Sequence, residues 1–77
     1  MSELTWGDTV QVIAEADVSL RPGSLAEVVG IREITTAMQA RDFDSEIGEK
    51  VFLIEFGDGY SAEVLSKWIE KQTLPEH

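Results

Sequence analysis

The sequence predicts a small all-β domain. Short runs of β-branched and aromatic residues recur along the chain, and clusters of Gly, Pro and Asp separate them, which is typical of strands joined by turns. The chain has 77 residues, so one domain over 1–77 is expected, with a barrel from about 5 to 71 and short flexible tails. Because it contains no Cys, an apolar core must stabilise it without disulfide bonds. Together these observations predict a single small barrel or sandwich.

The first two expected strands lie in the N-terminal half of the chain. Thr9 to Ile13 alternates polar and apolar residues over most of its length, as a strand with one buried face does. Ala26 to Ile31 is a second β-rich run, and it follows the turn signal Arg21-Pro22-Gly23. Both runs are therefore predicted to be strands.

The next two strands are predicted to form a hairpin around Gly57-Asp58-Gly59. A two-residue turn at Asp58-Gly59 would place Phe56 opposite Ser61 and Ile54 opposite Glu63, mixing apolar and charged residues on one face. A three-residue loop, with Gly59 in the left-handed conformation, gives only apolar or amphipathic partners on that face: Phe56 with Tyr60, Ile54 with Ala62, and Phe52 with Val64. We therefore predict the three-residue loop.

The chain after Leu65 has two interpretations. In the first, Glu63 to Gln72 forms an amphipathic helix, because its apolar residues have helical spacing. In the second, a helical turn over Leu65 to Trp68 precedes a closing strand over Ile69 to Gln72. We favour the turn and strand, because the hairpin already uses Ala62 and Val64 as strand residues. Trp68 is expected in the core.

A long segment from Glu33 to Glu49 joins the second and third strands. It contains helix formers, which predict either one short helix near Thr36 to Arg41 or a mobile flap. Long loops in small domains are often functional, so a partner surface is expected here. The remaining apolar pattern predicts the following core residues: Val10, Val12, Val28, Ile31, Phe52, Ile54, Phe56, Ala62, Val64 and Ile69.

The charge balance excludes several partner classes. Against 15 Asp and Glu there are 6 Lys and Arg, giving a net charge of −9, and the cations are scattered along the chain. Nucleic acids and anionic membranes are therefore unexpected partners, whereas a basic protein is favoured. The apolar runs are far too short to span a bilayer, and together with the lack of Cys they predict a cytoplasmic protein.

Carboxylates are plentiful, but a catalytic or metal-binding arrangement is hard to assemble from this sequence. The single histidine is His77, the last residue, so neither an activated nucleophile nor a zinc site is expected. Asp42-Phe43-Asp44-Ser45-Glu46 is similar to the first half of a calcium loop, but Ile47 and Leu53 stand where Gly and Glu are needed. We expect no enzyme activity, no cofactor and no metal.

Two sets of residues are candidates for partner binding. One is an acidic cluster around an aromatic residue, where carboxylates would orient a basic partner and the ring would supply apolar burial: Asp42, Phe43, Asp44, Glu46 and Glu49. The alternative is a semi-apolar strand face formed by Val51, Leu53 and Leu65. Both sets predict contact with another protein, and neither predicts an oligomeric state.

The chain resembles the small bacterial Src-homology-3-type (SH3-like) barrels. The resemblance rests on four stretches: Gly7-Asp8-Thr9-Val10, Pro22-Gly23 before Ala26 to Ile31, Phe52 to Gly59, and Ile69-Glu70. It implies a five-stranded SH3-like barrel with a short helical turn before the last strand. The expected long loop between strands 2 and 3, Glu33 to Glu49, departs from the shorter loops of many such barrels. Toxin-immunity proteins and accessory subunits, such as the variable chain of ferredoxin-thioredoxin reductase, share this pattern.

The function expected from these observations is non-enzymatic. The first hypothesis is a small acidic interaction module, in its sharpest form an immunity or inhibitor protein that binds a basic partner. The alternative is an accessory or regulatory subunit that packs on a larger enzyme through Val51, Leu53 and Leu65.

Overall fold

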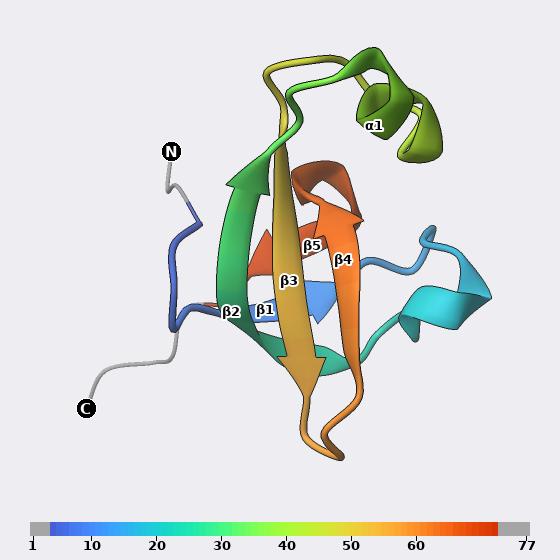
Figure 1. Ribbon diagram of the computed structural model, residues 1–77. Coiled ribbons are helices and arrows are strands. Elements are labelled where there is room, and N and C mark those ends of the chain that lie inside the picture. The colour runs from blue at the N-terminus through green and yellow to red at the C-terminus, as the bar shows by residue number, and fades with distance from the viewer. Residues whose placement is uncertain (1–3, 73–77) are drawn as a thin grey trace.

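Five antiparallel strands make up most of the chain that the computed structural model describes, residues 4–72 (Figure 1). They form one sheet in the order β4-β3-β2-β1-β5, which confirms the all-β prediction. The strand bounds are Thr9–Val12 for β1, Leu25–Glu33 for β2, Lys50–Phe56 for β3, Ser61–Leu65 for β4 and Ile69–Lys71 for β5. His77 and most of the expected tails lie outside the described residues.

Three short helical segments connect the strands. The 3-10 helix η1 spans Val18–Leu20, α1 spans Ala37–Asp42, and the 3-10 helix η2 spans Ser66–Trp68. Helix α1 confirms the helical interpretation of the long connection, and it begins where the Thr36 hydroxyl accepts the Gln39 N–H at 3.1 Å. Within residues 4–72, no helix has the length and apolar character needed to cross a membrane.

The C-terminal half has the predicted hairpin and closing strand. Ile54 lies opposite Ala62 and Phe52 opposite Val64, while the Phe56 N–H donates to the Tyr60 carbonyl at 2.8 Å. Gly59 has a φ of +91°, as the three-residue loop requires. After β4 comes the turn η2 and then β5, so the alternative of a helix from 63 to 72 is wrong.

The main apolar core lies on the inner face of the sheet. It contains the predicted core residues, of which Ile31 and Ala62 are half-buried and the others buried. Ala16 and Ala26 are further members of this cluster that the sequence pattern did not identify. Trp68 is half-buried and packs against this cluster, as expected of a core residue.

A second core cluster lies where α1 covers one end of the sheet. It consists of Ile34, Ala40, Val51 and Leu65, with Phe43 and Trp68 packed against it. Val51 and Leu65 pair across β3 and β4, and their exposed fractions are only 1% and 2%. The expectation that they form a semi-apolar surface with Leu53 is corrected here, because α1 and its flanking residues cover them.

Candidate functional site

The connection between β2 and β3 is a folded unit, which we call the acidic lobe (residues 34–49). At its base, the Ile34 N–H donates to the Glu49 carbonyl at 2.8 Å, and the Gly48 N–H donates to the Ile34 carbonyl at 2.9 Å. Ile34 is fully buried and Ala40 nearly so, both within the second core cluster. The lobe sits at the end of the sheet opposite the β3–β4 hairpin (Figure 1).

Three of the predicted contact residues are presented to solvent by the lobe. Asp42, Asp44 and Glu46 are all exposed. The ion pairs found among residues 4–72 involve other carboxylates, those of Asp8, Asp58 and Glu63. The lobe also exposes two apolar side chains, Met38 at 72% and Ile47 at 59%. It therefore offers uncompensated negative charge together with apolar area.

The other two predicted contact residues help to hold the lobe together. Phe43 is half-buried against the second core cluster, and the Arg32 guanidinium lies 5.5 Å from its ring centroid. Glu49 is exposed, but its carboxylate accepts the Glu46 N–H at 3.2 Å. The sequence therefore located the lobe, and the structure separates its exposed carboxylates from its structural residues.

The electrostatics of Glu49 fit this structural role. The adjacent Ser45 hydroxyl, the Glu46 N–H and the positive charge of Lys67 hold the pKa of Glu49 below its usual range. The Ser45 hydroxyl is buried and lies outside hydrogen-bond geometry, so the Glu46 N–H provides the directed contact. Glu49 therefore stays ionised within the turn that closes the lobe.

Carboxylates do not gather into a metal-binding group in the described part of the chain. Among residues 4–72, no three His, Cys, Asp or Glu side chains are close enough to share an ion.

The outward face of the sheet holds an acidic pair that the sequence analysis missed. Glu27 on β2 lies directly opposite Glu55 on β3, and both are exposed. Thr9 and Ser61 extend this row onto β1 and β4. The β2–β3 pairing was not predicted from the sequence, because a bulge between Val28 and Gly30 shifts the register within β2.

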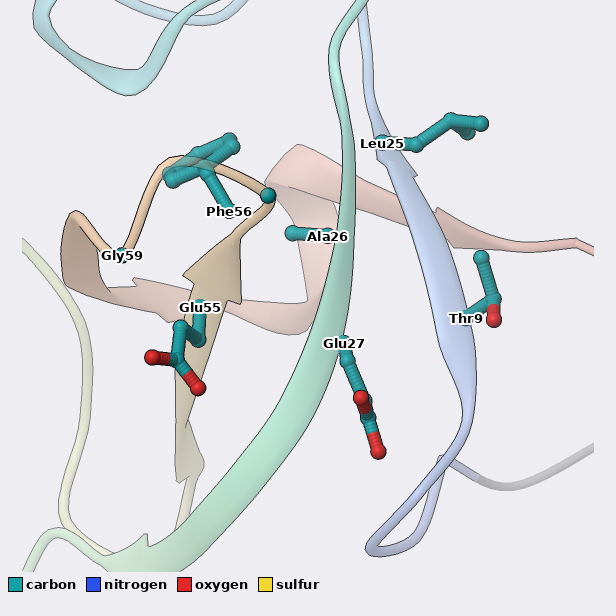
Figure 2. Close-up of a pocket in the computed structure, with 8 residues that line it drawn as sticks. Thr9, Leu25, Ala26, Glu27, Glu55, Phe56 and Gly59 are labelled. Atoms are coloured by element: carbon teal, nitrogen blue, oxygen red, sulfur yellow. The ribbon is translucent and has the colours of Figure 1, made fainter.

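Beside this pair the surface is hollowed to a volume of about 450 Å³ (Figure 2). We call this the sheet-face hollow. It is lined by residues of β1, β2 and β3 and of the hairpin loop: Thr9, Leu25, Ala26, Glu27, Glu55, Phe56, Gly57 and Gly59.

A neighbouring cluster around Arg21 joins η1 to the hairpin. The Arg21 guanidinium donates to both carboxylate oxygens of Asp58, at 2.9 and 3.0 Å, and lies 4.5 Å from the Tyr60 ring centroid. The Tyr60 N–H and then Arg21 lower the pKa of Asp58. The charges of Arg21 and Asp58 pair with each other inside the molecule, so we assign this cluster a structural role.

Comparisons of the chain with protein families, with curated proteins and with solved structures found no match. The functional interpretation therefore rests on the chain's own geometry and charge.

Proposed function

We propose that this protein is a non-enzymatic interaction module, an SH3-like barrel that binds a basic partner protein through the acidic lobe. The observation that carries the proposal is a folded lobe with three exposed carboxylates, Asp42, Asp44 and Glu46, that form no ion pair within residues 4–72. An acidic surface of this kind accelerates encounter with a cationic protein and orients it.

The topology supports the barrel part of the proposal. Strand β1 pairs with both β2 and β5, so the first and last strands of the chain lie side by side next to the main core. The turn η2 stands between β4 and β5, where the resemblance implies a helical turn. The long connection between β2 and β3 forms the lobe, and the barrel acts as its rigid support.

Preorganisation makes the lobe suitable for binding. Its backbone is fixed by the hydrogen bonds at Ile34 and Gly48, and its apolar side is already buried. A partner therefore meets a formed surface, and little conformational entropy is lost on association. Met38 and Ile47 supply apolar area that the partner buries next to the carboxylates.

An inhibitor or immunity role is the sharpest form of the proposal. A net charge of −9 on 8.5 kDa complements an enzyme whose own site is basic, such as one that acts on a polyanion. The alternative of an accessory subunit loses its proposed contact, because Val51 and Leu65 are buried and Leu53 alone is half-exposed.

The test compares two triple variants in binding to a partner captured from the native lysate. Asp42→Asn, Asp44→Asn and Glu46→Gln remove the lobe's exposed charges and change the net charge from −9 to −6. Glu15→Gln, Glu33→Gln and Glu70→Gln give the same net charge from exposed positions outside the lobe. We expect the lobe variant to associate about tenfold more slowly at low salt and to lose most of its salt dependence.

The matched control variant distinguishes a specific role of the lobe carboxylates from a general effect of net charge. If both triple variants slow association equally, only net charge matters and the lobe is not the contact. If neither variant changes the rate or its salt dependence, the acidic partner surface is refuted.

A further inference from the structure

The sheet-face hollow contains a local electrostatic conflict. Glu27 and Glu55 are cross-strand neighbours of like charge, an arrangement that destabilises a sheet. In Figure 2 the two side chains extend from neighbouring strands into the lower part of the view, with their carboxylates apart. A cation placed between the two carboxylates would turn this repulsion into attraction.

The chain does not supply that cation from any of its 6 Lys and Arg residues. Three of them form ion pairs elsewhere: Arg21 with Asp58, Arg32 with Glu63, and Lys71 with Asp8. The other three lie toward the lobe end of the sheet: Arg41 in α1, Lys50 at the start of β3, and Lys67 in η2. Within residues 4–72, no Lys or Arg side chain forms an ion pair with Glu27 or Glu55, so a cation from another molecule can bind between them.

The remaining lining of the hollow suits a peptide segment. Leu25 is 56% exposed and lies two residues before Glu27 on the outward face of β2. Successive same-face positions on a strand are roughly 6.6 Å apart, which is also the repeat of side chains on one side of an extended peptide. An extended segment can therefore place an apolar side chain on Leu25 and a cationic one beside Glu27.

We propose that the sheet-face hollow is a docking site for an extended basic segment of a partner protein, with an arginine or lysine side chain between Glu27 and Glu55. The inference rests on the proposed function in taking the partner to be basic, and it adds a second contact. The hollow lies at the hairpin end of β3, and the lobe packs on Val51 near its other end. Val51 and Glu55 are four positions apart, roughly 13 Å along the strand. One partner surface can cover both.

The experiment is an NMR titration of the ¹⁵N-labelled protein at low ionic strength. The probe is a blocked peptide that carries leucine and arginine in turn at every second position, with serine between them, so that both kinds of side chain lie on one side of the extended chain. Its control carries uncharged citrulline in place of arginine. We expect the arginine peptide to shift the amide signals of Thr9, Leu25, Glu27 and Glu55, and the citrulline peptide to bind about tenfold more weakly.

Two variants test the role of the acidic pair. Glu27→Gln with Glu55→Gln removes the repulsion, so it stabilises the fold while weakening the arginine peptide about tenfold. Glu15→Gln with Glu70→Gln makes the same change in net charge at other exposed positions and leaves binding within about twofold. Glu27→Lys provides an internal cation opposite Glu55, so it also stabilises the fold and abolishes binding.

The possible outcomes distinguish a failure of the docking site from a failure of the proposed function. Shifts confined to the lobe would overturn the docking site while supporting the lobe as a contact. Shifts at the hollow without any effect of the lobe charges on partner association would support the docking site and refute the lobe. Equal binding of the arginine and citrulline peptides would overturn the docking site, because recognition would then be apolar only.

Discussion

Arg32 connects three parts of the molecule through one side chain. Its guanidinium donates to both carboxylate oxygens of Glu63, at 2.8 and 3.2 Å, and lies over the Phe43 ring. It thereby joins β2 to β4 and both strands to the acidic lobe. The hydrogen bond and the charge of Arg32 lower the pKa of Glu63, and the bond to Glu63 raises the pKa of Arg32.

This contact predicts a pH-dependent effect of Arg32→Gln. A carboxyl group whose pKa is lowered on folding contributes stability above its unfolded pKa, about 4.3 for Glu, and loses it as the pH falls through the folded pKa. The stability lost in Arg32→Gln is therefore expected to be largest near pH 7 and to shrink toward pH 2. The loss that remains at low pH reflects the contact with Phe43.

The measurement is urea unfolding of the wild type and the variant across this pH range. Arg41→Gln is the control, because Arg41 is exposed and makes no ion pair within residues 4–72. A stability difference for Arg32→Gln that is constant with pH would show that Glu63 contributes nothing through this pair.

The β3–β4 hairpin depends on one backbone conformation in its loop. Gly59 has a positive φ, and the space next to its Cα is open, so only backbone strain opposes a side chain there. Gly57 stands two residues earlier with equally open space and without a positive φ. The two glycines therefore form a matched pair in the same loop.

We predict that Gly59→Val destabilises the protein by about 1–3 kcal/mol, because a β-branched residue resists positive φ. Gly57→Val is expected to change stability by less than about 1 kcal/mol. Thermal or denaturant unfolding measures both. Equal effects of the two substitutions would contradict the bulged three-residue loop as the determinant of register.

Elements that depend on local sequence patterns were predicted better than features that depend on contacts between residues far apart in the chain. The hairpin register follows from local alternation and two glycines, and the short helix near Thr36 to Arg41 was one of the two interpretations that local helix formers allowed. The burial of Val51 and Leu65 depends on Ile34 and Ala40, which reach them only through the path of the long connection. Local patterns contain no information on which segment covers a sheet face.

At the scale of the whole molecule, negative charge opposes the compact state. A net charge of −9 leaves most carboxylates without a cation, and the three ion pairs of residues 4–72 are at the surface. Self-repulsion is screened by salt over roughly 8–10 Å at physiological ionic strength. Stability is therefore expected to depend on salt.

We predict that the melting temperature rises when NaCl increases from about 10 to about 150 mM, by roughly 4–8 °C for each kcal/mol gained. The triple variant Glu15→Gln, Glu33→Gln and Glu70→Gln has less self-repulsion and is expected to respond less. NaCl is chosen because strongly excluded salts stabilise through apolar burial. A melting temperature that falls with NaCl would mean that the ion pairs outweigh the repulsion.

The sequence by itself determined the all-β class, the hairpin, the closing strand and most of the main core, because alternation, glycine positions and apolar runs act over a few residues. It also located the acidic segment that forms the lobe. Only the tertiary structure decided which side chains of that segment are exposed, that Val51 and Leu65 are covered, and that Glu27 faces Glu55. These three features depend on contacts between residues far apart in the chain, and a bulge in β2 sets the last of them.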